Sequence, residues 1–350
     1  MGSRKNHHFV PQFYFRRFSL DQRSICVLRR DTGEVVRQAS IKSQACKSRF
    51  YGEDSMEEAL GSIEGLCSSA LRQLVEVKNP MLLSQEDRNY VLTWLALQRS
   101  RTMAAREIGQ PMRDALLPAY IQMTVGEMDN YSDSDKLKLQ NAIDSEFSPV
   151  RNQLTEMGIA TECAPSLGDL CPLLLFNSTN RPFIFGDAPV VFHNGFCRDV
   201  VRRGVLGFDT PGLLVIFPLT PHALLLLVDA EIYKIKRARL NQIKIQELRD
   251  VAALNKLQIH SASSCVYFND FRFKAYVSEL WRSERHNLCA PLGHVNEGPG
   301  FCSGTGESMG EIIHAFQPQL PYKLSLSFLE HEVVSDREYR FSRRSERSVC

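Results

Sequence analysis

The sequence predicts an α+β fold, in which a helical N-terminal half packs on a mostly antiparallel sheet from the C-terminal half. Apolar residues recur at helical spacing from residue 54 to about 158, whereas short apolar runs separated by Asn, Pro and Gly dominate residues 173–228. Helices and strands that cluster in separate stretches favour an α+β domain over an alternating parallel sheet. With 350 residues, 43% of them hydrophobic, the chain can bury a sizeable core.

The N-terminal half is predicted to hold one hairpin and four helices. Residues 24–37 alternate around the turn sequence Asp31-Thr32-Gly33, a pattern typical of a β-hairpin. From residue 54 the apolar period becomes that of a helix, and Ser84 with Asp87 forms a capping-box-like pair at the start of a second helix. The predicted helices cover residues 54 to about 79, 84 to about 108, 112–126 and 133–158.

The C-terminal half is predicted to be mostly strand, with one late helix over residues 238–262. Residues 285–310 hold six Gly and two Pro, which indicates a flexible loop. The predicted organisation is therefore a single α+β domain over residues 1–284, the Gly-rich loop, and a C-terminal strand with a basic tail over residues 311–350. Strands are predicted at residues 173–176, 183–185, 190–193, 213–217, 224–228, 265–268 and 324–329.

Positive charge is concentrated at the N-terminus, although the net charge of the whole chain is only +2. Residues 1–50 contain eleven Lys or Arg and three acidic residues. This local excess would attract a phosphate-rich partner such as nucleic acid. An evenly solvated basic surface with no partner explains the same count equally well.

Several function classes lose support from missing motifs. The ten Cys show no CxxC or CxxH spacing, which favours reduced thiols over disulfides or a zinc site. The basic N-terminus has no apolar signal core, and no apolar run approaches the ~20 residues of a membrane span, so a cytoplasmic protein is predicted. Phosphate-loop, dinucleotide-binding, zinc-protease and esterase-elbow motifs are absent, so no cofactor or resident metal is predicted.

The N-terminal segment is the first candidate functional region. Four Phe and one Tyr lie within residues 9–18, and burying each ring would contribute roughly 1.5–3 kcal/mol. We therefore expect this segment to fold inward and to hold His7, His8 and Gln12 in fixed positions. One imidazole could act as a general acid or base. The alternative is a histidine that only hydrogen bonds to backbone. Adjacent histidines on an extended chain point to opposite faces, so both rarely join one site.

Four acidic residues between Glu53 and Glu58 form a second candidate. Asp54 and Glu57 are suitably placed to cap a helix start, which would stabilise it by about 1 kcal/mol. Alternatively, Glu53, Asp54 and Glu57 could bind a cationic substrate or a divalent metal. A carboxyl group whose pKa is shifted by its neighbours could also transfer protons.

The remaining candidates lie on later elements. Gln98 and Arg101 share a helix face with Trp94, which indicates a polar pocket in the core, whereas Arg99 is expected to form a surface salt bridge. Asp187 lies between two predicted strands, where it could reach a site or only stabilise its turn. Asn255 lies within an apolar helix pattern and needs a polar partner if it is buried.

The motifs in these regions resemble one family, DUF4238, a domain of unknown function. Its hallmark is an N-terminal His-His-Phe-Val-Pro-Gln-Phe-Tyr-x-Arg-x-Phe, which residues 7–18 match almost without change. The resemblance spans roughly residues 5–270 and does not extend beyond residue 285. Further matching segments lie at residues 63–65, 97–102, 185–190, 217–220 and 254–255.

Fungal arginine-containing cyclodipeptide synthases are similar to this family. The resemblance implies an enzyme that condenses two amino acids, delivered on tRNA, into a cyclic dipeptide. An Asp-Asp-x-x-Glu motif is implicated in that chemistry. The nearest match here is Glu53-Asp54-Ser55-Met56-Glu57, with Glu in place of the first Asp.

Three functions follow as hypotheses. The first is an aminoacyl-tRNA-dependent transferase that forms a cyclic dipeptide, with no membrane partner and with the basic N-terminus contacting the tRNA. The second is a nucleic-acid-processing nuclease or toxin effector that uses His, carboxylates and a divalent metal. The third is a binding protein without catalysis. For the first, the catalytic residues would be Asp54, Glu57, His7 and His8, and the substrate-binding residues Glu53, Gln12, Gln98, Arg101, Asp187 and Asn255.

Overall fold

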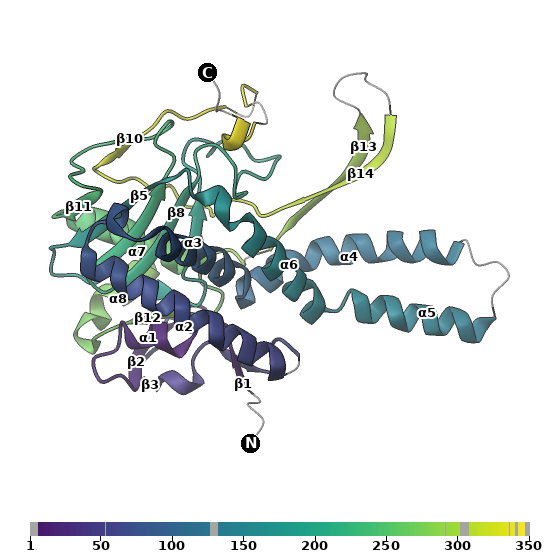
Figure 1. The fold of residues 1–350 in the computed structure, drawn as a ribbon, viewed down its shortest axis with the longest axis horizontal. Coiled ribbons are helices and arrows are strands. Elements are labelled where there is room, and N and C mark those ends of the chain that lie inside the picture. The colour runs from purple at the N-terminus through teal and green to yellow at the C-terminus, as the bar shows by residue number, and fades with distance from the viewer. Residues whose placement is uncertain are drawn as a thin grey trace.

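The computed structural model confirms the α+β class (Figure 1). A compact body carries two projections on the same side, the helix pair α4–α5 and the hairpin β13–β14. The structure describes residues 6–52, 54–126, 132–290, 292–301, 308–335, 337–339 and 342–346.

The helices and strands follow the chain as numbered in Figure 1. The helices are α1 Gln12–Arg16, α2 Asp54–Val77, α3 Gln85–Ser100, α4 Met103–Gly126, α5 Asp133–Glu146, α6 Pro149–Cys163, α7 Leu248–Ser261 and α8 Lys274–Glu284. The first strands are β1 Asn6–His8, β2 Ser24–Arg29, β3 Val35–Ser40, β4 Cys46–Ser48, β5 Cys171–Asn177, β6 Phe185–Gly186, β7 Val191–His193 and β8 Leu214–Thr220. The remaining strands are β9 Ala223–Val228, β10 Lys234–Ile235, β11 Gln242–Ile245, β12 Cys265–Phe268, β13 His294–Phe301, β14 Ser308–Phe316 and β15 Leu329–Glu330.

Two sheets form the body. The larger has the order β11-β5-β9-β8-β7, and all its neighbouring strands are antiparallel except β11 and β5. The smaller has the order β3-β2-β12-β6. The predicted N-terminal hairpin is confirmed as β2–β3, with Gly33 at a positive φ of 72° in its turn. Its pairing with β12 means that the N-terminal residues contribute strands as well as helices.

The aromatic N-terminal segment is buried, as predicted. On helix α1, the ring of Tyr14 stacks on Phe217 of the larger sheet, with 5.1 Å between centroids. The ring of Phe15 packs edge-on against Tyr267 of the smaller sheet at 4.7 Å. Both rings also contact Phe185. This short helix therefore joins the two sheets, and the tyrosine hydroxyl donates a hydrogen bond to the carbonyl of Pro218 at 2.5 Å.

Three of the predicted helices were wrong as single elements. The helix predicted over residues 133–158 is divided into α5 and α6, because Ser148 caps the start of α6 by accepting a hydrogen bond from the amide of Arg151 at 3.3 Å. The helix that begins at the cap Ser84 ends at Ser100, and α4 starts at Met103 because the hydroxyl of Thr102 accepts a hydrogen bond from the amide of Ala105 at 3.2 Å. The prediction for residues 238–262 missed strand β11, in which Ile243 and Ile245 are buried and alternate with more exposed neighbours. That period of two is the signature of a strand.

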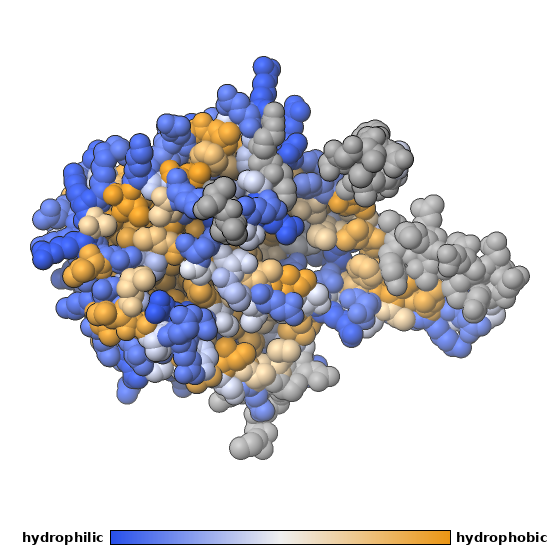
Figure 2. Space-filling view, turned by 45° about the horizontal axis from the view of Figure 1, so that its top comes forward, coloured by the Kyte–Doolittle hydropathy of each residue, from blue (hydrophilic) through white to orange (hydrophobic). Residues whose placement is uncertain are grey.

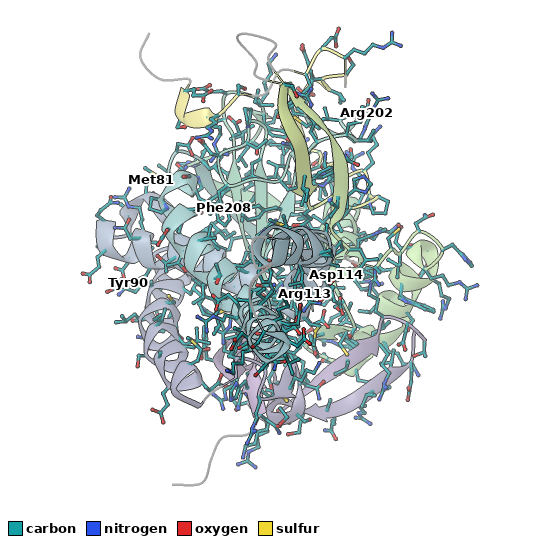
Figure 3. All side chains as sticks on the ribbon, turned by 90° about the vertical axis from the view of Figure 1, so that its right-hand side faces the viewer. Met81, Tyr90, Arg113, Asp114, Arg202 and Phe208 are labelled. Carbon is teal, nitrogen blue, oxygen red and sulfur yellow. The ribbon has the colours of Figure 1, made fainter. Side chains whose placement is uncertain are left out.

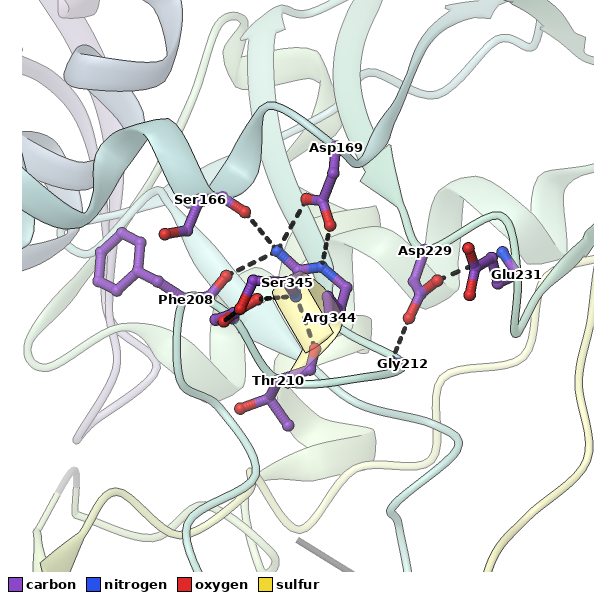
Figure 4. Close-up of polar contacts among 10 residues, drawn as sticks. Ser166, Asp169, Phe208, Thr210, Gly212, Asp229, Glu231, Arg344 and Ser345 are labelled. Atoms are coloured by element: carbon purple, nitrogen blue, oxygen red, sulfur yellow. Dashed lines mark hydrogen bonds and ion pairs between the residues drawn. The ribbon is translucent and has the colours of Figure 1, made fainter. Parts of the chain in front are cut away.

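The predicted elements of the C-terminal region also needed correction. The segment taken as a flexible loop, residues 285–310, includes β13, which pairs with β14 in an antiparallel hairpin. The strand predicted over residues 324–329 is irregular, and only Leu329–Glu330 pairs, with β10. The "basic tail" contains a buried arginine, Arg344, whose guanidinium lies between Asp169 and three backbone carbonyls (Figure 4).

The surface carries few features that depart from an ordinary globular domain. Apolar and polar side chains are interspersed on the face shown in Figure 2. Figure 3 looks toward the α4–α5 projection, where the partly buried Arg113 forms an ion pair of 3.2 Å with the exposed Asp114. Among the described residues, no helix is long and apolar enough to cross a membrane. The eight cysteines in the described ranges are all free thiols, in agreement with the prediction.

Candidate functional site

Strand β1 places the two adjacent histidines on opposite faces. It pairs antiparallel with β4, with His7 opposite Lys47 and His8 opposite Cys46. His7 is completely buried and His8 is half-buried. This is the alternation expected of an extended segment, and it gives the two imidazoles different tasks.

The contacts of His7 indicate a structural role. Its Nδ1 accepts a hydrogen bond from the backbone N–H of Tyr51 at 3.1 Å, and its ring stacks on the tyrosine ring with 5.9 Å between centroids. Because Nδ1 is an acceptor, the neutral ring carries its proton on Nε2. The backbone-bonded alternative therefore describes His7.

His8 lies beside the acidic residues of helix α2. Its backbone N–H donates to Oε1 of Glu57 at 3.4 Å, and its Nε2 lies 3.1 Å from the carbonyl oxygen of Lys42. A carbonyl only accepts, so Nε2 carries the proton of the neutral ring and Nδ1 is the basic nitrogen. The amide nitrogen of Gln12 lies 3.5 Å from the same Nε2, but both groups are donors when Nε2 carries the proton, so this contact is not a hydrogen bond in that tautomer. The imidazole of His8 is thus oriented by neighbours and remains half-exposed.

Below the surface, Arg101 connects His8 to Glu64 and Tyr51. Its guanidinium is completely buried at the break between α3 and α4, and it donates to Glu64 at 2.8 Å, to the carbonyl of His8 at 2.8 Å and to the hydroxyl of Tyr51 at 3.1 Å. The hydroxyl of Tyr51 in turn donates to the carbonyl of Arg101 at 3.1 Å. One side chain therefore ties β1, α2 and α3 together.

Two carboxylates of α2 face His8 and Arg101. Glu57 and Glu64 are seven residues apart, which places them two turns apart on the same helix face. Burial raises the pKa of Glu64, the guanidinium of Arg101 lowers it, and the charge of Glu57 raises it. The side chain of Glu64 is 22% exposed, so a partly desolvated carboxyl group lies close to the surface beside His8. We call His8, Glu57, Glu64 and Arg101 the acidic cluster.

Sequence reasoning missed two members of this site. Glu64 was noted only within a matching segment, although its spacing from Glu57 on one helix was the available signal. Tyr51 had no signal of its own, because its role arises from contacts with residues 44 and 50 positions away. Of the acidic residues predicted before them, Asp54 begins α2 but its side chain lies outside what the structure describes, as does all of Glu53.

Gln98 supports the cluster from behind. It is completely buried, and its amide nitrogen donates to the carbonyl of Phe9 at 3.0 Å. Its Oε1 has no hydrogen-bond partner among the described residues. Gln98 therefore fixes the N-terminal segment against α3, where the sequence predicted a polar group in the core.

Asp187 and Asn255 are held away from the acidic cluster by contacts of their own. Asp187 is buried and accepts hydrogen bonds from the backbone amides of residues 263–265 at 2.7–3.1 Å. Burial raises its pKa to about 6, and these amides act in the opposite direction. Asn255 bonds the amide of Ile184 at 3.0 Å and the carbonyl of Pro182 at 2.8 Å. Both residues stabilise chain turns, so the structure gives neither of them a contact with the cluster.

Arg99 does not form the predicted surface salt bridge. Its guanidinium lies over the ring of Phe192, 4.2 Å from the centroid, and donates to Gln317. Burial lowers the pKa of Arg99, while the charge of Glu156 raises it. Stacking on an aromatic face is a common environment for a desolvated guanidinium.

The described residues contain no group of three or more His, Cys, Asp or Glu side chains arranged to hold a metal ion. The acidic cluster itself offers two carboxylates, and its half-exposed imidazole hydrogen bonds to backbone. Its geometry suits recognition of a cationic group and proton transfer, since carboxylates bind guanidinium and ammonium groups through charge-assisted hydrogen bonds.

A separate buried histidine, His193, was not singled out from the sequence. It ends β7 and is 3% exposed, and its Nδ1 has no hydrogen-bond partner among the described residues. Burial lowers the pKa of His193 to about 4, and the charge of His331 acts in the same direction. His193 lines a cavity together with the basic residues Arg198 and Lys323, and none of the described residues that line this cavity is acidic.

The protein should therefore lose stability in mild acid through His193. Its pKa is lower in the folded than in the unfolded chain, so the unfolded chain binds more protons between pH 6.5 and 4. The stabilisation is complete above pH 6.5 and about 3 kcal/mol of it is lost by pH 4. Urea unfolding at several pH values measures this, with His193→Asn as the reference. Equal pH slopes for the two proteins would contradict the assignment.

Comparison with known proteins identifies a family. Residues 6–271 match the family described as Protein of unknown function (DUF4238). No curated protein and no solved structure matches the chain. The matched range includes β1, the acidic cluster and both sheets, and it stops before the β13–β14 hairpin. The chain therefore belongs to the DUF4238 family.

Proposed function

We propose that this protein is an aminoacyl-tRNA-dependent transferase that forms a cyclic dipeptide, with arginine as one of the two amino acids. The observation that carries the proposal is the acidic cluster, where Glu57 and Glu64 lie beside His8 at a half-exposed surface. The buried guanidinium of Arg101 holds this surface in place from below. The likeness of the DUF4238 family to arginine-containing cyclodipeptide synthases supports the choice of substrate.

The reaction needs groups that bind a cation and move protons. The amine of one aminoacyl ester attacks the carbonyl of the other, and the ribose hydroxyl of one tRNA leaves. The amine of the resulting dipeptidyl ester then attacks its own ester, which releases the second tRNA. Two ester bonds break and two amide bonds form. Each step takes a proton from nitrogen and returns one to a ribose oxygen.

The cluster divides these tasks among its members. Glu57 would bind the guanidinium of the arginyl group through its Oε2, which has no hydrogen-bond partner among the described residues, while Oε1 accepts from the backbone N–H of His8. Glu64 and Nδ1 of His8 would take the proton from the attacking amine and return it to the leaving hydroxyl. Burial raises the pKa of Glu64, which favours exchange of a proton by this carboxyl group. Positioning of the two esters would supply much of the remaining rate.

An exposed basic surface adjoins the cluster. Lys42, Lys47 and Arg49 are exposed, Lys47 lies opposite His7 on β4, and the carbonyl of Lys42 contacts His8. These cations are placed to contact the phosphates near a tRNA acceptor end.

The first test measures tRNA binding against salt concentration. Each removed phosphate contact should reduce the slope of log affinity against log salt by about 1. The triple variant of Lys42, Lys47 and Arg49 to alanine should therefore lose about three units of slope. A matched variant of Lys136, Lys138 and Lys244, exposed or partly exposed lysines on α5 and β11, should keep the slope. Equal slopes for both variants would contradict this tRNA-binding surface.

The second test measures the reaction. Glu57→Gln and Glu64→Gln should each reduce formation of cyclic dipeptide by about 10²–10⁴-fold, measured by mass spectrometry with purified protein and charged tRNA. Glu58→Gln is the matched control, because Glu58 is exposed on the same helix and should leave the rate unchanged. Melting curves verify that the variants fold. No cyclic dipeptide from the native protein, together with cleavage of RNA or DNA when Mg²⁺ or Mn²⁺ is added, would instead favour the nucleic-acid-processing hypothesis.

A further inference from the structure

A second site is indicated by a cavity of about 270 Å³ at the edge of the larger sheet. Its apolar wall consists of Leu214 and four side chains from the C-terminal segment, Leu324, Leu326, Leu329 and Val333. This segment follows the last residue that matches the family. The cavity shares no residue with the acidic cluster.

The polar groups of this cavity are all neutral or basic. Arg198, Lys323 and the imidazoles of His193 and His331 line it, and none of its described lining residues is acidic. Arg198 has one carboxylate neighbour, Asp199, at 3.1 Å from its Nε. A pocket lined by two cationic side chains, with no acidic side chain among its described lining residues, favours an anionic ligand.

His193 contributes to this cavity a buried side chain with incomplete hydrogen bonding. Its ring is 3% exposed and lines the cavity, yet its Nδ1 has no hydrogen-bond partner among the described residues. Leaving a buried polar atom unpaired costs free energy, so such atoms usually have a partner. A carboxylate in the cavity would provide an acceptor for this imidazole.

The wall beside His193 is fixed before any ligand binds. The hydroxyl of Tyr233 accepts hydrogen bonds from the amides of Gly195 and Phe196 at 2.9 and 3.2 Å, and it donates to the carbonyl of Gly212 at 2.9 Å. The imidazole of His331 packs closely on the backbone at Gly195, where a Cβ would lie 2.6 Å from its Nε2. A rigid wall reduces the entropy lost on binding.

We propose that this cavity binds a small organic carboxylate with an apolar body. The carboxylate lies between His193 and the cations Arg198 and Lys323, and the apolar body contacts the leucine wall. A volume of 270 Å³ is below the usual range of roughly 300–1,000 Å³ for drug-sized ligands and corresponds to roughly nine water molecules. The ligand therefore has about ten non-hydrogen atoms.

Calorimetric titration of the full chain with defined probes tests this proposal. Octanoate and 3-phenylpropionate have the expected size and represent an aliphatic and an aromatic source of the same chemistry. At least one should bind saturably, and about tenfold more tightly than octan-1-ol, which lacks the charge. Failure of both acids to bind, or equal binding of octan-1-ol, would overturn the proposal. Tighter binding of inorganic phosphate than of either acid would also overturn it.

Variants locate the bound acid. Arg198→Ala and Lys323→Ala should each weaken binding by about three- to tenfold, since each removes a charge-assisted contact. Leu326→Trp should abolish binding by filling the cavity. Lys138→Ala, at an exposed lysine on α5, is the matched control and should bind as the native protein does. Unchanged binding by both alanine variants would overturn the proposal even if the tryptophan variant does not fold. Cyclic dipeptide formation is a separate readout, so loss of one function can be distinguished from loss of the other.

Discussion

Replacement of Arg101 by methionine is expected to lower the free energy of unfolding by about 4 kcal/mol. The substitution leaves the carboxylate of Glu64 without the cation that compensates its burial. It also removes the donor to the buried carbonyl of His8 and to the hydroxyl of Tyr51. Breaking a buried ion pair by removing one partner typically costs about 3–5 kcal/mol, because the remaining charge stays desolvated.

Urea unfolding monitored by tryptophan fluorescence measures this loss. Arg72→Ala is the control, since Arg72 is exposed and its ion pair with Glu76 is 4.0 Å long; we expect a change within about 0.5 kcal/mol. The double variant with Glu64→Leu and Arg101→Met should recover about 2 kcal/mol relative to the sum of the single variants, because no unpaired charge remains. A loss below about 1 kcal/mol for Arg101→Met would show that this ion pair does not hold β1 on α2 and α3.

Within the acidic cluster, we expect Arg101 to determine stability and Glu57 and His8 to act in the reaction. Arg101 is completely buried and uses three of its five N–H groups on protein partners, so a substrate at the surface does not reach it. His8 is half-buried and lies at the surface, and Oε2 of Glu57 is buried without a hydrogen-bond partner among the described residues. Substitutions at Arg101 should therefore change unfolding first, whereas substitutions at Glu57 should change the reaction with little change in unfolding.

Local periodicity predicted the fold well where one element has one pattern. The α2 helix and the β2–β3 hairpin follow from the spacing of apolar residues, and β5, β7, β8 and β9 of the larger sheet follow from short apolar runs. Periodicity failed where two elements adjoin without a strong break, as at residues 238–262, where β11 precedes α7. A four-residue strand is too short to outweigh the helical pattern of the residues that follow it.

The candidate site shows the same limit at the level of single residues. The aromatic segment predicted inward packing, and His7, His8, Glu57, Gln98 and Arg101 do gather around β1 and α2. Asp187 was predicted to join them because it lies near strand ends, but a nearby turn satisfies its carboxylate. Partners 37 to 93 residues away decide these roles, and one sequence does not reveal such pairs.

Two adjacent arginines near the C-terminus also have roles that the sequence does not distinguish, because Arg343 is exposed and Arg344 is buried. The guanidinium of Arg344 donates to both carboxylate oxygens of Asp169 at 2.9 and 3.1 Å. It also donates to the carbonyls of Ser166, Phe208 and Thr210 at 2.5, 2.7 and 2.8 Å (Figure 4). The planar fork of arginine can serve all of these acceptors together, which a lysine ammonium cannot.

Arg344→Ala is therefore expected to destabilise the protein by about 3 kcal/mol and to release the C-terminal segment, since it leaves three carbonyls without their donor. Arg344→Lys should lose about half as much, because one ammonium reaches only some of the acceptors. Arg343→Ala removes the same charge from an exposed position and should change stability by less than about 0.5 kcal/mol. Urea unfolding gives the energies, and limited proteolysis reports release of the segment. Equal behaviour of the two alanine variants would mean that residues 342–346 do not anchor the chain between α6 and β8.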